Sequence, residues 1–162
     1  MTLNKEDYYQ KVKLAILVAF DILVINDKNE LLLGKRKNSP AKDFLFTPGG
    51  NMHKGETFEE AIRRISSKEI GFEISLQEVK LNGIYDQTYK ENFIDDKFPS
   101  QYIDFAFEYK IKNKKVDENI FLSQHADIVW MPIEEIMKSK TVHQYVKNYF
   151  IKNPDNRLIY GK

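Results

Sequence analysis

Nearly continuous apolar runs near the start of the chain are typical of strands that are buried on both faces. The first run covers residues 14–26 (LAILVAFDILVIN), with Asp21 as the polar exception, and the second begins at Leu31 and ends at Arg36. The stretch DKNE between them predicts a turn. Residues 44–50 (FLFTPGG) predict a third, short extended piece, after which Pro-Gly-Gly is expected to turn the chain.

A helical pattern follows at residues 58–70 (FEEAIRRISSKEI). Its apolar stripe recurs at three- and four-residue spacings and consists of Phe58, Ile62, Ile65 and Ile70. Thr57 precedes the helix and Glu60 follows three residues later, which is the spacing of a capping box. Gly71 stands where a glycine commonly ends a helix.

The rest of the chain continues this alternation of strands and helices. We predict strands at residues 78–89, 100–112 and 126–133, a short helix at 7–13, and terminal helices at 133–139 and 141–153. Strands on both sides of one central helix, with helices at the end, indicate an α/β fold, an α/β/α sandwich with a central mixed β-sheet. No linker or repeat divides the sequence, so residues 1–162 are interpreted as a single domain.

Composition narrows the classes of partner. The 25 Lys and Arg residues nearly cancel the 24 Asp and Glu residues, so no broad basic surface for a nucleic acid is expected. The absence of cysteine excludes disulfides and thiolate nucleophiles, and leaves oxygen and imidazole groups as metal ligands. The longest apolar run, LAILVAF, is far shorter than a membrane span, and we expect a soluble, cytoplasmic protein without a membrane partner.

The segment from Gly50 to Phe72 resembles the Nudix box, G-x5-E-x7-R-E-U-x-E-E-x-G-U, in which U is an aliphatic residue. The positions that fall in register are Glu56, Arg64, Glu69 and Gly71. In that family the box is a loop-helix-loop that holds divalent metal against a pyrophosphate. The resemblance therefore implies the Nudix fold with its loop-helix-loop.

Two carboxylates of the ordinary box are missing here. Ile65 stands where the family has the glutamate after arginine, Lys68 replaces the first of the paired glutamates, and Ser66 replaces an aliphatic residue. Residues three and four apart share one helix surface, so Lys68 puts a positive charge into the patch that would otherwise gather carboxylates. Glu69 and a backbone carbonyl near Gly50 can still hold one metal ion, but a multi-metal site for attack on phosphorus is not expected.

From about Asp7 to Met131 the chain, including its form of the box, resembles one branch of the family, the GDP-mannose mannosyl hydrolases, which lack those glutamates. The matching segments are LLLGKRKNSPAKDFLFTPGG, GETFEEAIRRISSKEIG, GIYDQTYKENF, QYIDFAFEYKI and LSQHADIVWM. The resemblance implies hydrolysis of GDP-mannose, or a related GDP-hexose, by water attack at the anomeric carbon with inversion. The implied partner is a small-molecule GDP-sugar, and the implied assembly is a homodimer.

The missing carboxylates are consistent with this chemistry. A metal ion that neutralises the diphosphate makes GDP a good leaving group, so one Mg²⁺ per subunit, with Mn²⁺ as a substitute, suffices. The resemblance implies that Glu69, the Gly50 carbonyl and the Gln124 side chain bind this ion. The attacking water needs a base, and His125 in SQHAD matches the catalytic histidine of the branch.

The resemblance also assigns charged residues to the substrate. Arg36 is expected to bind the diphosphate, because a guanidinium group binds phosphate oxygens in a bidentate manner. Arg64 is expected near the leaving oxygens as a catalytic residue, with the alternative that it only orients a glutamate. Asp21 would be costly to bury without a partner, so it either pairs with a cation or contacts the substrate, and the resemblance favours the sugar.

Aromatic and amide side chains complete the predicted site. Tyr102 is expected to face the diphosphate. Tyr8 and Tyr9 are expected near the guanine, with a dimer contact as the alternative. Gln87 stands where the branch has a histidine of the sugar-side loop. On the same side Thr88 replaces an aromatic residue and Leu45 replaces a tryptophan, while Asn51 stands where the best-known form of the branch has an arginine that supports catalysis. The preferred GDP-sugar therefore stays open.

Two other functions stay open from the sequence. A conventional Nudix diphosphatase would cleave the P–O–P bond of a nucleotide sugar, although Ile65 and Lys68 argue against it. A nucleotide-sugar binding domain with weak activity is the second alternative. The coexistence of Glu69, Gln124 and His125 favours catalysis over binding alone.

Overall fold

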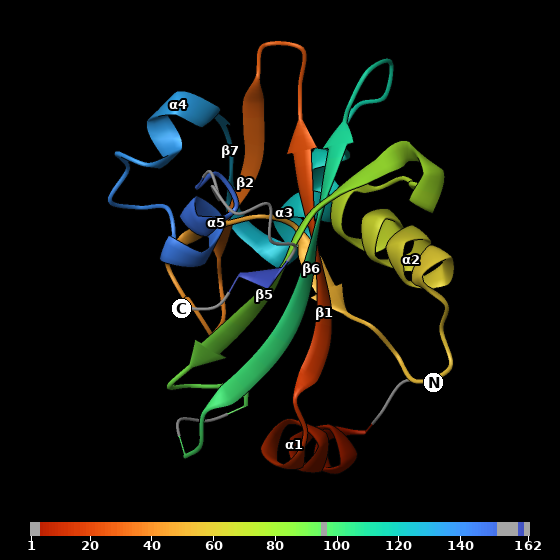
Figure 1. Cartoon of the computed structure of the whole chain (residues 1–162), viewed down its shortest axis with the longest axis vertical. Coiled ribbons are helices and arrows are strands. Elements are labelled where there is room, and N and C mark those ends of the chain that lie inside the picture. The colour runs from red at the N-terminus through yellow and green to blue at the C-terminus, as the bar shows by residue number, and fades with distance from the viewer. Residues whose placement is uncertain (1–3, 95–96, 152–158, 161–162) are drawn as a thin grey trace.

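A computed structural model describes residues 4–94, 97–151 and 159–160 of the chain. A mixed sheet lies at the centre, with helices on both of its faces (Figure 1). This arrangement confirms the predicted α/β sandwich. Within the described ranges, no helix is long and apolar enough to cross a membrane.

The elements follow the predicted order closely. The helices are α1 (Lys5–Leu14), α2 (Phe58–Ile70), α3 (Glu118–Gln124), α4 (Ile133–Ile136) and α5 (Gln144–Asn148), with a short 3₁₀ turn η1 (Leu76–Glu78). The strands are β1 (Leu17–Ile25), β2 (Glu30–Arg36), β3 (Leu45–Phe46), β4 (Gly49–Asn51), β5 (Val79–Tyr89), β6 (Ser100–Lys110), β7 (His125–Pro132) and β8 (Ile159–Tyr160). As predicted, the capping box of Thr57 and Glu60 begins α2, and Gly71, in the left-handed conformation, ends it.

Strand β1 organises the sheet. It pairs in parallel with β6 along its whole length and antiparallel with β4 near its middle. Its pairing with β2, in contrast, is recorded only at Ile25 and Leu31, beside the turn that joins the two strands. Strand β2 instead pairs with β7. The strands β1 and β2 therefore diverge beyond the turn that joins them. The sheet has two parts, one with β1, β4, β5, β6 and β8 and the other with β2, β3 and β7.

Each face of the sheet carries its own apolar core. Phe20, Ile22 and Val24 of β1 pack in the core that includes α2 and α3. Leu23 and Ile25 pack in the core that includes α4 and α5. Because side chains alternate along a strand, Asp21 lies on the second face. The alternation explains why this strand is apolar at almost every position.

Three local predictions were wrong. Gly49 does not turn the chain but begins β4, because this segment pairs with β1, and the turn comes at residues 54–55. Gln124 and His125 lie outside every predicted element, but they end α3 and begin β7. The helix predicted at residues 141–153 is shorter than expected, and its last two residues lie outside the described part of the chain.

Two glycines with positive φ allow a matched test of how α2 is fixed. Gly71 has φ 88°, and a Cβ there would lie 2.4 Å from the Cβ of Asp117. Gly55 has φ 91°, but nothing lies within 4 Å of a Cβ at that position. Gly71→Ala should lower the free energy of unfolding by about 2–3 kcal/mol, and Gly55→Ala by about 1 kcal/mol. Urea denaturation measures both, and equal losses would contradict the packing argument.

Candidate active site

A cavity of about 300 Å³ lies where β1 and β2 diverge, and residues from both parts of the sheet line it. It brings together almost all of the residues that the sequence nominated. Those that line it are Tyr8, Asp21, Arg36, Gly50, Glu69, Gln87, Tyr102, Gln124 and His125. Arg64 and Tyr9 are not among the lining residues.

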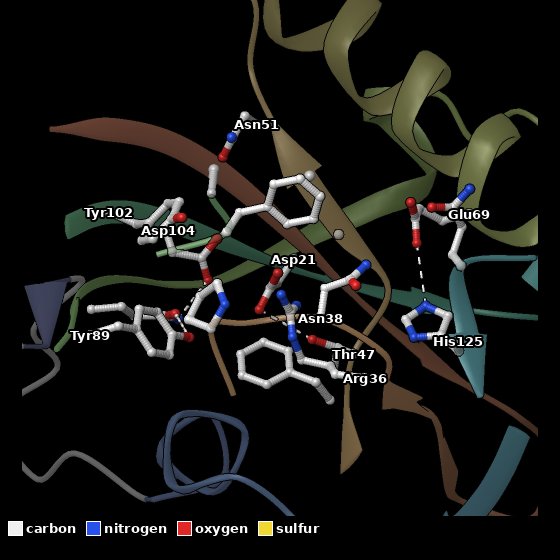
Figure 2. Close-up of a pocket in the computed structure, with 18 of the residues that line it drawn as sticks. Asp21, Arg36, Asn38, Thr47, Asn51, Glu69, Tyr89, Tyr102, Asp104 and His125 are labelled. Carbon is white, nitrogen blue, oxygen red and sulfur yellow. Dashed lines mark hydrogen bonds and ion pairs between the residues drawn. The ribbon is translucent and has the colours of Figure 1, made fainter. Parts of the chain in front are cut away.

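His125 and Glu69 meet at one side of this cavity (Figure 2). The Nε2 atom of His125 lies 3.3 Å from Oε2 of Glu69, and both side chains are buried. The imidazole stacks on Phe121 of α3 with 4.4 Å between ring centroids. A Cβ at Gly34 would lie 2.3 Å from Cγ of the imidazole, so a glycine on β2 makes room for the ring. Packing therefore fixes the ring beside a carboxylate.

The predicted metal ligands are all oxygen donors, which suits a hard divalent cation. The Glu69 carboxylate, Gly50 and Gln124 line the same cavity. Lys68 lines it as well, and no group of three or more His, Cys, Asp or Glu side chains among the described residues could hold a metal ion. The donor set thus fits one ion held partly by neutral oxygens, and does not fit a cluster of ions.

The departures from the Nudix box have structural partners. Ile65 is buried in the core, and its Cγ1 would lie 3.5 Å from a Cβ at Gly50, so it packs beneath β4. The hydroxyl of Ser66 accepts a hydrogen bond from the Ile74 amide at 2.9 Å and donates to the Arg63 carbonyl at 3.1 Å. These positions stabilise α2 and the segment after it.

Arg64 is committed to the loop that precedes α2. Its guanidinium donates to both carboxylate oxygens of Glu56 and to the carbonyl of Asn51. These hydrogen bonds hold the pKa of Glu56 down at about 2. The geometry matches the alternative in which the box arginine orients a glutamate. Its catalytic role stays a prediction.

A buried polar network lies at the other side of the cavity. Asp21 and Asp104 are diagonal neighbours on the parallel strands β1 and β6, because Asp104 pairs with Ala19. The Tyr149 hydroxyl lies 2.5 Å from Oδ2 of Asp21 and 2.8 Å from Oδ2 of Asp104. Gln87 donates from Nε2 to Asp104 Oδ2 at 3.0 Å and to the Tyr149 hydroxyl at 2.7 Å.

Sequence reasoning missed Asp104 and Tyr149. Asp104 is a carboxylate in an otherwise aromatic strand, so the argument applied to Asp21 could have found it. Tyr149 has no comparable signal, because it follows α5 and reaches the network from far along the chain. Gln87 lines the cavity as predicted, but both ends of its amide are used inside the protein, since Tyr89 donates to Oε1.

The two buried carboxyl groups titrate unusually. Burial raises the pKa of Asp21 to about 6, although hydrogen bonds from Tyr149 and Thr47 oppose the rise. Burial and the neighbouring charge of Asp21 raise the pKa of Asp104 well above its ordinary value. The positive charge of Arg36, which lines the same cavity, also opposes the rise in the pKa of Asp21.

The remaining predicted residues divide between the cavity and the surface. Arg36 lies over the Phe46 ring, 5.4 Å from its centroid, and its buried Nε has no hydrogen-bond partner within the described residues. The Tyr8 hydroxyl accepts a hydrogen bond from Asn51 at 3.2 Å. Tyr9 packs edge-on against Phe98 instead, at 5.1 Å. Tyr102 packs edge-on against Tyr89.

The family model for the NUDIX domain matches residues 16–152. The chain belongs to the Nudix family of hydrolases. The matched span includes both parts of the sheet, α2 and the cavity lining from Ala19 to His125. The Nudix fold expected from the sequence is therefore confirmed.

Curated relatives and solved structures agree with this assignment. The chain is 31% identical over 134 residues to the low-salt glycan biosynthesis protein Agl8 of Haloferax volcanii, covering 82% of this chain and 79% of that protein. It is 44% identical over 69 residues to an ADP-ribose pyrophosphatase of Methanocaldococcus jannaschii, covering 42% of this chain and 38% of that protein. The MutT protein structure from Methanosarcina mazei Go1 aligns with a TM-score of 0.65 at 19% identity, covering 83% of this chain and 90% of that one.

The raised pKa values of Asp21 and Asp104 predict that stability depends on pH. The folded protein keeps protons on this pair that the unfolded chain releases above about pH 4, so their contribution is complete in acid. The part that Asp21 contributes is lost as the pH rises through about 6. Asp104→Asn removes one titrating group and should therefore gain stability relative to the wild type between pH 5 and pH 8.

Urea denaturation of both proteins at these two pH values measures the difference. Comparing variant with wild type cancels the other carboxylates, including Glu56. Asp127→Asn on the exposed surface is the control and should show no such trend. A constant difference between wild type and Asp104→Asn would contradict the raised pKa values.

Proposed function

We propose that this Nudix hydrolase cleaves GDP-mannose, or a related GDP-hexose, by water attack at the anomeric carbon with inversion, releasing GDP. The observation that carries the proposal is the site around Glu69. The buried imidazole of His125 lies beside the Glu69 carboxylate, and Lys68 lines the same cavity. An ordinary box would gather several carboxylates there. Such a site suits one metal ion and a separate base. The name of the Haloferax relative, a glycan biosynthesis protein, supports a sugar-containing substrate.

His125 is the base in this proposal. Its Nε2 is the nitrogen that faces Glu69, and a nearby negative charge stabilises the imidazolium that forms when water loses its proton. Stacking on Phe121 and the space left by Gly34 hold the ring in this orientation. Preorganisation of this kind is what a general base needs.

The charged groups nearby suit the leaving nucleotide. Glu69, the Gly50 carbonyl and the Gln124 side chain would hold Mg²⁺, which neutralises diphosphate charge when it is bound. Arg36 lines the same cavity, and its guanidinium group suits binding to phosphate oxygens. Tyr102 lies in the same lining. The homodimer expected from the resemblance stays a prediction.

A second candidate is cleavage of a P–O–P bond. The Methanocaldococcus relative is an ADP-ribose pyrophosphatase, and the Nudix domain of Shewanella oneidensis NrtR, solved with ADP ribose, aligns with a TM-score of 0.58 at 15% identity. Such a reaction usually requires more carboxylates than the box retains here. The burial of Ile65 in the core leaves no ligand at that position.

Hydrolysis in ¹⁸O-labelled water distinguishes the two reactions. We expect GDP-mannose with Mg²⁺ to give labelled sugar and unlabelled GDP, because water attacks carbon. Mass spectrometry of both products locates the label. Label in a phosphate group would establish the diphosphatase instead, and other GDP-hexoses are assayed in parallel to identify the sugar that is turned over.

Replacing the base tests the role of His125. His125→Ala should lower kcat by the ~10²–10⁴-fold typical of a lost general base, with little change in the affinity for GDP. His53→Ala is the matched control, because His53 is partly exposed and is not among the residues that line the cavity. Weakened GDP binding with normal kcat would assign His125 to binding rather than catalysis.

A further inference from the structure

The polar network around Tyr149 cannot be satisfied if both carboxyl groups are ionised. A phenolic hydroxyl has one proton to donate. The Tyr149 hydroxyl nevertheless lies within hydrogen-bonding distance of Oδ2 on both Asp21 and Asp104. The negative charge of Asp21 also raises the pKa of Asp104. One of them must therefore carry a proton, and the buried pair holds a single negative charge.

The surrounding donors place that charge on Asp21. Its Oδ2 receives hydrogen bonds from Thr47 at 3.1 Å and from Tyr149 at 2.5 Å, and the positive charge of Arg36 lies nearby. Asp104 is 1% exposed and faces the negative charge of Asp21. A neutral Asp104 can donate a hydrogen bond to the Tyr149 oxygen. The Tyr149 hydroxyl then donates its own hydrogen bond to Asp21, which stays ionised. Gln87 donates to both Asp104 and Tyr149 and braces this chain.

The arrangement leaves one oxygen of Asp21 available to a ligand. Both recorded hydrogen bonds reach Oδ2, and none from the described residues reaches Oδ1. Among the described residues, Oδ1 of Asp21 is not one of the polar atoms that are both fully buried and without a hydrogen-bond partner. Asp21 itself lines the cavity. A Cβ at Gly49 would lie 2.2 Å from this oxygen, so only a glycine leaves room for it.

We propose that Asp104 and Tyr149 are positioning residues that share one proton and thereby fix Asp21 as an anionic acceptor for a sugar hydroxyl of the substrate. The inference rests on the proposed function, because it assigns Asp21 to the sugar and leaves the diphosphate to Arg36 and the metal ion. A buried negative charge repels a phosphate and binds a neutral hydroxyl donor. Asp21 touches the substrate, whereas Asp104 and Tyr149 act through it.

The test compares the affinities for GDP-mannose and for GDP by titration calorimetry with Mg²⁺. His125→Ala serves as the background, because suppressed turnover allows equilibrium binding to be measured. Asp104→Ala and Tyr149→Phe should each lower the affinity ratio of GDP-mannose to GDP by about tenfold, the size of one hydrogen bond to a charged group. The affinity for GDP alone should not change.

Two further variants separate positioning from general damage. Asp104→Asn should lower the ratio much less than Asp104→Ala, because its amide donates to Tyr149 where the protonated carboxyl did, although it no longer accepts the hydrogen bond from Gln87. Tyr145→Phe removes another phenolic hydroxyl from α5, one that hydrogen-bonds only the backbone of Thr88, and should keep the ratio. Equal losses of GDP and GDP-mannose affinity would show a merely structural role and overturn the proposal. The proposal would also be overturned if Asp104→Asn lowered the affinity ratio as much as Asp104→Ala. The same holds if the His125→Ala protein bound GDP-mannose no more tightly than GDP.

The isotope experiment reports on the proposed function separately. If label enters a phosphate but the affinity ratio changes as expected, the reaction assignment fails and the sugar contact stands. If label enters the sugar but the ratio is insensitive to Tyr149→Phe and Asp104→Ala, the reaction stands and the positioning role fails.

Discussion

The parallel pairing of β1 with β6 is the constraint on which the site depends. It places Asp21 and Asp104 on one face as diagonal neighbours, while β4 pairs with the opposite edge of β1, where β2 has diverged beyond the shared turn. The backbone of β2 must then find another partner, which is β7. This exchange opens the cavity and brings His125, at the start of β7, opposite Arg36 at the end of β2.

The two sides of the cavity differ in how their charges are satisfied. Glu69 and His125 meet on one side, and Asp21, Asp104 and Tyr102 lie toward the other (Figure 2). On the first side the buried imidazole nitrogens have no hydrogen-bond partner among the described residues, and Nε2 faces the Glu69 carboxylate. On the second side Tyr149 hydrogen-bonds Oδ2 of both carboxyl groups and Gln87 hydrogen-bonds Oδ2 of Asp104, so this network holds the two side chains in place.

Sequence reasoning succeeded where a local rule was sufficient. The capping box of α2, its glycine end and the apolar strand β1 follow from neighbouring residues, and the structure has all three. The cavity lining was largely predicted because a family resemblance supplied the long-range information. Tyr149 could not be found in this way, because its partner Asp21 lies 128 positions earlier in the sequence. The helix α3 was missed because seven residues are too few for a clear periodicity.

The substitutions in the box connect packing to the type of reaction. Ile65 is buried in the core beneath β4, and Ser66 ties the end of α2 to Ile74, so both positions serve the fold. A glutamate in place of Ile65 would put a charge into an apolar core, which is costly without a partner. An exchange at Ile65 alone would therefore restore that carboxylate only at a cost to the fold. Chemistry that needs only one metal ion and a separate base is the kind that this core permits.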